Sequence, residues 1–222
     1  MLRDTLREWG RQFLAPSDVG VREVEYSFIT THIPSIPSTR GLTPRALDFG
    51  SGFSWLGLAA ARLGYETTVV DLRSISWPFI HPKFFFQQRD LLDSSTPADY
   101  FDLVINCSSI EHVGLKRYGG KVEDVDADLK VMGKLRATLK GKGLMLLTTN
   151  IGQDAVHGVS HRTYGRERLP LLLEGWAMEK AEYWKKNSGD QWAEVEQEEV
   201  FKVEGSSNKY ALGLFVLRKA RA

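Results

Sequence analysis

The sequence predicts an α/β fold, a mostly parallel β-sheet covered by helices, and two observations carry this prediction. From about residue 45 onward, short apolar runs alternate with stretches whose apolar residues recur at helical spacing. This alternation is typical of parallel strands joined by crossover helices. The composition, 42% hydrophobic and 11% aromatic over 222 residues, is sufficient for one domain with a full core.

Five strand candidates follow one another from residue 45 to residue 150, each a short apolar run bounded by polar residues or glycine. They span residues 45–50, 66–72, 83–90, 100–108 and 143–150. Between the first two, Leu56, Ala60 and Leu63 form a helical stripe that Gly64 is expected to end. Between the last two, a second stripe is formed by Val125, Leu129, Met132, Leu135 and Leu139.

The rest of the chain divides around this core. Residues 1–44 are expected to form an amino-terminal helical cap and linker, because Leu2, Leu6, Trp9 and Phe13 recur at helical spacing and a segment rich in Pro, Ser and Thr follows. Residues 45–150 form the predicted ligand-binding core. Residues 151–222 are expected to hold substrate-side loops and closing strands, because 174–186 and 209–219 read as strands.

Charge and cysteine content exclude several classes of protein. Lys and Arg number 29 and Asp and Glu 28, with no long block of one sign, so nothing favours a nucleic-acid partner. Cys107 is the only cysteine, which excludes an internal disulfide and a zinc site built on paired cysteines. No apolar stretch approaches the ~20 residues of a membrane span. A cytoplasmic protein without a signal peptide is the expectation.

The stretch 46–64, ALDFGSGFSWLGLAAARLG, places an acid and two glycines between a strand and a helix. A dinucleotide fingerprint would have its third glycine at the position of Trp55, and no P-loop Gly-Lys-Ser/Thr follows. What remains is Asp48-x-Gly50-x-Gly52. An acid at this point repels a pyrophosphate and attracts a positive group, so we expect a cationic ligand.

At this turn the chain resembles class I S-adenosylmethionine (SAM)-dependent methyltransferases, whose first motif is acid-x-Gly-x-Gly. The match is DFGSGFS, with Ser54 where a third glycine is common. The resemblance implies a Rossmann-like, seven-stranded and mostly parallel sheet with helices on both faces. It also implies that Asp48, Gly50 and Gly52 line the methionine end of the cofactor.

The resemblance continues at the ends of the next two strands. Asp71 stands where the family places its ribose-binding acid, and Asp90 where it contacts the adenine amino group, with the backbone of Leu91 beside it. A carboxylate can accept hydrogen bonds from both ribose hydroxyls. The alternative is that these acids are ordinary turn formers at strand ends. The resemblance covers residues 46–150.

Candidates for the chemistry follow the fourth and fifth strands, since ligands of open α/β sheets bind outside the carboxyl ends of the strands. His112 is the first choice of general base, because a neutral imidazole can take a proton from a hydroxyl acceptor near pH 7. His161 is the second. The alternative role of His112 is hydrogen bonding in the wall of the pocket or contact with the adenine. Neighbouring Glu111 and Arg162 are candidate substrate ligands, with solvation and a surface salt bridge as their alternatives.

No metal site is predicted, because no His-x3-His pair lies on a predicted helix and His157 and His161 fall in a glycine-containing loop. Residues 109–119 also resemble a methyltransferase-like subgroup with the motif Ser-x-Glu-His-x-Gly-Leu-x-Arg-Tyr-Gly. That resemblance adds Tyr118 to the substrate residues and implies a sugar-like or other small polar acceptor. The chain reads NCSS where amino-methyltransferases carry Asp/Asn-Pro-Pro-Tyr, which favours methylation of an oxygen.

The sequence therefore predicts a SAM-dependent O-methyltransferase of a small molecule. Two rivals remain: a NAD-dependent oxidoreductase, in which Asp71 would also fit a ribose, and a non-catalytic SAM-binding regulatory subunit. The oligomeric state is left open.

Overall fold

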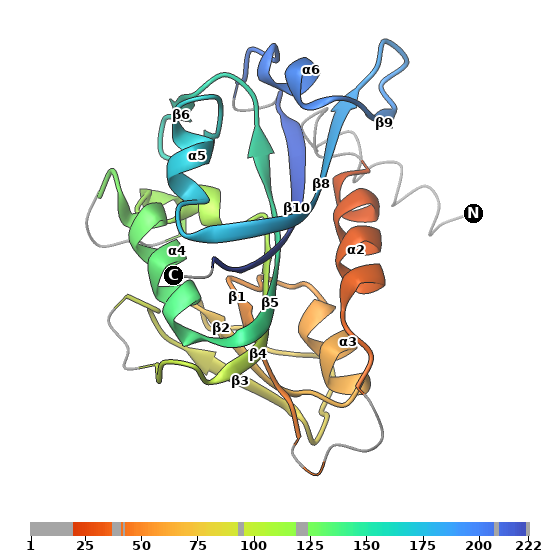
Figure 1. Ribbon diagram of the computed structural model, residues 1–222, viewed down its shortest axis with the longest axis vertical. Helices are drawn as coiled ribbons and strands as arrows, with labels where there is room; N and C mark the ends of the chain where they lie inside the picture. The colour runs from red at the N-terminus through yellow and green to blue at the C-terminus, as the bar shows by residue number, and fades with distance from the viewer. Residues whose placement is uncertain are drawn as a thin grey trace.

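The computed structural model describes residues 20–36, 41, 43–92, 96–118, 124–206 and 209–220. Its main sheet has eight strands in the order β3-β2-β1-β4-β5-β10-β8-β9 (Figure 1). They are β1 (Arg45–Phe49), β2 (Glu66–Asp71), β3 (Phe84–Gln88), β4 (Phe101–Cys107), β5 (Leu139–Ile151), β8 (Trp176–Lys186), β9 (Trp192–Glu194) and β10 (Ala211–Lys219). The strands β1 to β5 pair with one another in parallel. The pairings of β10 with β5, β8 with β10 and β9 with β8 are antiparallel. The predicted α/β class and the mostly parallel sheet are confirmed.

Helices lie on both faces of this sheet, with α2 and α3 on one side and α4 and α5 on the other (Figure 1). The helices are α2 (Val21–His32), α3 (Leu56–Arg62), α4 (Ala127–Thr138), α5 (Arg168–Leu172) and α6 (Gln197–Phe201). Two single-turn 3-10 helices, η2 (Ile110–His112) and η3 (Lys116–Tyr118), follow β4. A separate hairpin pairs β6 (Ala155–His157) with β7 (His161–Thr163).

The two faces of the sheet form two hydrophobic cores, which the alternation of side chains along each strand separates. In β1, Ala46 belongs to the core under α2 and α3, and Leu47 to the core under α4 and α5. Leu144 and Met145 of β5 divide in the same way. Because both faces are covered, these strands read as continuous apolar runs rather than as alternating patterns.

The structure departs from the expected sheet at its far edge. Eight strands replace the seven implied by the family resemblance, because the three-residue β9 pairs antiparallel with the end of β8. The fifth strand is longer than expected, since β5 already begins at Leu139, with an irregular register against β4. Two stripe residues also differ from expectation: Leu63 and Val125 lie just outside α3 and α4 and are 48% and 73% exposed.

The strand order reverses between β1 and β4, and this positions the site. In doubly wound sheets, ligands bind at the carboxyl ends of the strands where the order reverses. Asp48 lies near the end of β1, Asp71 ends β2, and His112 follows β4. The helical stripe predicted at residues 2–13 lies outside the described residues. Among the described residues, no helix is long and apolar enough to cross a membrane.

Candidate active site

The turn after β1 is built on two glycines in the left-handed region. Gly50 has φ +67° and Gly52 φ +55°, conformations that other residues rarely adopt. A Cβ on Gly50 would lie 2.4 Å from the Ser109 Oγ at the start of η2. The turn therefore needs glycine both for its backbone angle and for its close approach to the segment that follows β4.

Asp48 is buried directly behind this turn, with 1% of its surface exposed. The Gly57 backbone N–H lies near its carboxyl group, and Oδ2 has no hydrogen-bond partner among the described residues. Burial, with a smaller contribution from the negative charge of Asp71, raises the Asp48 pKa to about 7. An unpartnered carboxyl oxygen in a buried position is a site for a donor or a cation.

Asp71 has the opposite environment at the end of β2. Its Oδ2 accepts from Gly52 N (2.9 Å) and Arg73 Nη2 (3.2 Å), and its Oδ1 from Arg73 N (2.9 Å) and Arg73 Nε (3.0 Å). Burial opposes ionisation, but the hydrogen bonds from Arg73 and Gly52 outweigh it and lower the Asp71 pKa. Two lone-pair sites on each oxygen are thus filled, mostly by Arg73.

The third predicted acid, Asp90, follows β3 next to Asp71. Arg89 N donates to Asp71 O (3.0 Å), which fixes the two strand ends together. Asp90 Oδ1 accepts a hydrogen bond from Leu92 N (2.8 Å). Asp90 therefore acts as a turn former at the end of a strand, the alternative role considered for these acids. The Leu91 side chain is buried in the core, which leaves its backbone as the part able to meet a ligand.

The segment after β4 is fixed by a short polar network. Asn106 Nδ2 donates to Ser109 Oγ (2.6 Å), and Ser109 Oγ donates to Phe49 O (3.1 Å) at the end of β1. Glu111, next in the segment, is 1% exposed and accepts from Thr149 Oγ1 (3.2 Å) of β5. Burial raises the Glu111 pKa to about 8, so this carboxyl group is largely protonated and uncharged at neutral pH.

Helix α2 contributes a second buried carboxylate, Glu25, to the same region. Its side chain is fully buried and accepts from Ser108 Oγ, from Thr148 Oγ1 (2.8 Å) and from Arg22 Nη1 (2.8 Å). Ser108 itself has φ +43°, an uncommon angle for a residue other than glycine. The cap helix is therefore tied to the carboxyl ends of β4 and β5 through one acid.

The same helix also covers the glycine turn. The Tyr26 ring meets the Trp55 ring edge to face at 5.2 Å. The sequence patterns do not point to Arg22, Arg73 or Ser108 as parts of this region. One signal for Glu25 was present in the sequence: it falls on the buried stripe of Val21, Phe28 and Ile29. A charged residue at a core position usually has a buried partner.

Three predicted residues gather after β4 and in the β6–β7 hairpin. The His112 ring lies 4.9 Å from the Tyr118 ring and 6.3 Å from the His161 ring. His112 Nδ1 lies 2.6 Å from Ser160 O; because a carbonyl only accepts, Nδ1 carries the proton and Nε2 holds the lone pair. Burial lowers the His112 pKa to about 4, which keeps the imidazole neutral.

His161 has a different setting. It is 3% exposed, pairs in register with His157 across the hairpin, and packs 5.6 Å from the Tyr210 ring. Its Nδ1 lies 3.2 Å from Ser160 Oγ. The loop expected around these histidines is therefore a hairpin. Among the described residues, no group of three or more His, Cys, Asp or Glu side chains is placed to hold a metal ion.

Arg162 points away from this cluster and is 2% exposed. Its guanidinium donates to Val113 O, to Asp124 O (3.2 Å) and to Val125 O (3.3 Å), and Nε lies 3.7 Å from Asp128 Oδ2. These contacts hold the start of α4 against the segment after β4. Arg162 was expected to contact substrate or to form a surface salt bridge. Its buried position among backbone carbonyls fits neither expectation.

The sequence was compared with models of protein families and with curated proteins. A family model described as "Caenorhabditis protein of unknown function, DUF268" matches residues 89–220, more than half of the chain. The matched segment runs from the end of β3 through β10 and leaves out the glycine turn. No curated protein matches the sequence.

Solved structures share the fold at low sequence identity. The 1,6-didemethyltoxoflavin-N1-methyltransferase of Burkholderia thailandensis, with S-adenosylhomocysteine bound, has a TM-score of 0.58 at 14% identity, over 99% of this chain and 87% of that chain. The N-methyltransferase NodS of Bradyrhizobium japonicum, also with S-adenosylhomocysteine, gives 0.55 at 15% identity, over 90% and 87%. The [4+2]-cyclase SpnF gives 0.54 at 14% identity, over 81% and 76%. The Rossmann-like methyltransferase fold is thereby confirmed.

Proposed function

We propose that this chain, which belongs to the family described as "Caenorhabditis protein of unknown function, DUF268", binds SAM and transfers its methyl group to a small polar acceptor, at an oxygen. The family description names no activity, so the proposal depends on the site. One observation carries it: a buried Asp48 oxygen, without a partner among the described residues, lies behind a turn of two positive-φ glycines, at the point where the strand order reverses.

The residues at this edge suit the parts of the cofactor. Asp48 and the turn of Gly50 and Gly52 would receive the positively charged methionine end, since the turn offers an acid and no phosphate-binding pattern. Asp71 would hold the ribose hydroxyls, and Asp90 with the Leu91 backbone would meet the adenine. The cofactor supplies an activated methyl group when bound. The protein supplies position, exclusion of water and removal of a proton.

His112 is the proposed base. Its Nε2 holds a lone pair because Nδ1 donates to Ser160 O, and its lowered pKa keeps it free of a proton at neutral pH. Nε2 would take the hydroxyl proton of the acceptor as the methyl group passes from the sulfur of SAM to the acceptor oxygen, which leaves SAH. His161 supports the wall of the same cluster and stands as the second candidate base. Glu111 and Tyr118 would contact the acceptor, whereas the contacts of Arg162 favour a positioning role.

Two other functions compete with this proposal. A nicotinamide-dependent oxidoreductase would also use Asp71 for ribose, but the turn lacks the third glycine and places Trp55 there. A SAM-binding protein without methyl transfer is the stronger rival, because the [4+2]-cyclase SpnF shares the fold. Fold alone does not decide between these activities.

Calorimetric titration of the full chain with SAM, S-adenosylhomocysteine (SAH) and NAD tests the cofactor. The proposal expects SAM and SAH to bind and NAD not to bind. Asp48→Asn and Asp71→Asn should each weaken SAH binding by about tenfold or more, the effect of losing a hydrogen bond to a charged group. Preferential binding of NAD would overturn the assignment.

Substitution of the two histidines then separates enzyme from binding protein. His112→Asn should abolish methyl transfer to a responding acceptor from a panel of hydroxylated metabolites, while SAH affinity stays within about twofold. His161→Asn is the matched variant from the same cluster. If both variants retain full transfer, neither histidine is the base. If SAH binds and no acceptor is methylated, the result favours a non-catalytic SAM-binding regulatory subunit.

A further inference from the structure

Tyr118 is the centre of a cationic cluster on the acceptor side of the edge. The Arg73 guanidinium lies 4.7 Å from the centroid of the Tyr118 ring, and that of Arg117 lies 5.4 Å from it. The His112 ring meets the same Tyr118 ring at 4.9 Å. One aromatic ring thus joins two arginines to the proposed base.

The two arginines differ in how their charge is balanced. Arg73 donates three hydrogen bonds to Asp71, one from its backbone and two from its side chain, and its guanidinium also lies 5.9 Å from the Phe53 ring. Arg117 is exposed and donates to the neutral Ser160 Oγ. In the described part of the chain, no carboxylate lies within ion-pair distance of Arg117.

Other charged groups that face this region do not cancel the charge of Arg117. Glu25 is paired with Arg22, and Asp71 with Arg73. Glu111 is largely uncharged at neutral pH because burial raises its pKa to about 8. A cofactor with a sulfonium would add positive charge to the same site. The acceptor side therefore carries an excess of positive charge close to His112.

We infer that the acceptor is an anion, a small molecule bearing a carboxylate or a phosphate, and that Arg117 binds its charged group beside Tyr118. This inference rests on the proposed function and names the class of its substrate. The guanidinium fork matches both kinds of oxyanion with paired hydrogen bonds. Because Ser160 contacts both Arg117 and His112, an anion held by Arg117 would place the rest of the molecule next to the base.

Calorimetry on the full chain saturated with SAH tests this with two matched pairs of probes. Benzoate is compared with benzamide, which differs from it mainly in charge, and phenyl phosphate with phenol, which lacks the phosphate group. At least one anion should bind about tenfold or more tightly than its neutral partner, as expected for charge-assisted hydrogen bonds. The pair that responds more strongly distinguishes a carboxylate from a phosphate acceptor.

Arg117→Gln should remove this preference, and Arg117→Lys should retain part of it because the charge remains without the fork. Arg62→Gln is the control for loss of one positive charge, since Arg62 is exposed at the end of α3, the helix that runs back from the carboxyl edge. Anion binding that is absent, or unchanged in Arg117→Gln, overturns the inference. SAH binding in the same samples distinguishes that outcome from failure of the proposed function.

Discussion

Two acids, one in each half of the carboxyl edge, have opposite environments. In the half formed by β1–β3, Asp71 receives four hydrogen bonds, and its pKa is lowered despite burial. In the half formed by β4, β5 and α2, Glu111 is more deeply buried beside the hydroxyl of Thr149, and its pKa rises to about 8. At neutral pH the first acid is charged and the second is not.

This difference shows that the position of an acid at the end of a strand does not determine its pKa. Asp48 and Asp71 end adjacent parallel strands, yet the Asp48 pKa is raised to about 7 and the Asp71 pKa is lowered. Local hydrogen-bond donors decide between these outcomes. Our proposal places the cofactor in the half where Asp71 keeps its negative charge, and the acceptor in the half where Arg117 has no carboxylate within ion-pair distance among the described residues.

Glu111→Gln should give the largest effect, in the pH dependence of stability. The ordinary pKa of this carboxyl is 4.5 and the folded value is about 8, so the folded state holds the extra proton between these values. Stability contributed by this proton is present at low pH and is lost as pH rises through about 8. Between about pH 5 and about pH 9, the unfolding free energy of the original protein should therefore fall by on the order of 3 kcal/mol more than that of the variant.

Urea unfolding at several pH values measures this change. Glu23→Gln, which removes an exposed carboxylate of α2, controls for the loss of one negative charge. Parallel pH curves for the original protein and Glu111→Gln would show that Glu111 is not held protonated, and the contrast between the two halves would disappear.

Gly50→Ala should destabilise the other half by about 2–4 kcal/mol, from left-handed strain together with overlap against a fixed neighbour. The overlap is with Ser109 Oγ, only 2.4 Å from the new Cβ. Gly158→Ala in the hairpin is the matched control, because Gly158 has φ +56° and nothing within 4 Å of its Cβ position. Equal losses in the two variants would mean that the approach of Ser109 to the turn does not constrain the protein.

Arg73→Gln should strengthen SAH binding by about fivefold, the effect of roughly 1 kcal/mol. The Arg73 side chain fills hydrogen-bonding positions on both Asp71 oxygens, so ribose hydroxyls must displace it. Calorimetry compares the variant with Arg62→Gln, which should match the original protein. Weaker binding in Arg73→Gln would show that the guanidinium belongs to the nucleoside site instead of competing with it.

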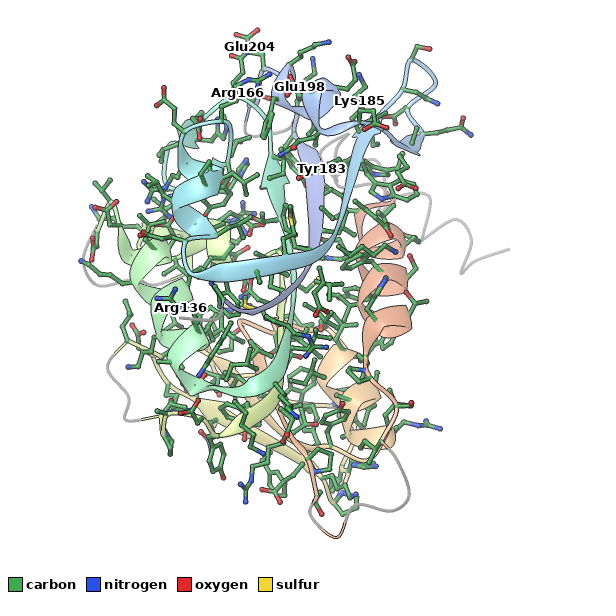
Figure 2. The ribbon with its side chains drawn as sticks, in the orientation of Figure 1. Arg136, Arg166, Tyr183, Lys185, Glu198 and Glu204 are labelled. Carbon is green, nitrogen blue, oxygen red and sulfur yellow. The ribbon has the colours of Figure 1, made fainter. Side chains whose placement is uncertain are left out.

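Arg166→Gln should have the smallest effect, with no measurable change in SAH affinity or in the unfolding midpoint. Figure 2 shows Arg166 and Glu198 near α6, far along the molecule from α3, and both side chains are about 60% exposed. Exposed ion pairs contribute little, because solvent screens them. A clear loss of SAH binding would mean that this exposed ion pair takes part in the site.

The core of the fold was predictable because its signals are local. Each parallel strand is a short apolar run, and the turn after β1 needs glycine at two positive-φ positions, which leaves a visible pattern. The edge strand β9 was missed because three residues, Trp192–Glu194, carry no periodicity. The hairpin was missed because its pairing of His157 with His161 depends on a turn with Gly158, not on strand propensity.

The site was predictable only in part, because several of its contacts join distant segments. The sequence places Asp71 at a strand end, but it does not show that Arg73 fills both of its oxygens. Glu25 reaches Thr148 across 123 residues, and no local pattern encodes that contact. Arg162 was chosen for its charge beside a histidine; its burial against backbone carbonyls follows from the path of the chain before α4.

A crystal structure of the full chain grown with SAH tests the central claim most directly. We expect density for the nucleoside at the ends of β2 and β3, its ribose hydroxyls on Asp71, its amino-acid end over the glycine turn near Asp48, and Arg73 moved off the Asp71 carboxylate. Density for SAH at another place, or an empty edge at saturating SAH with Arg73 still on Asp71, would contradict the account.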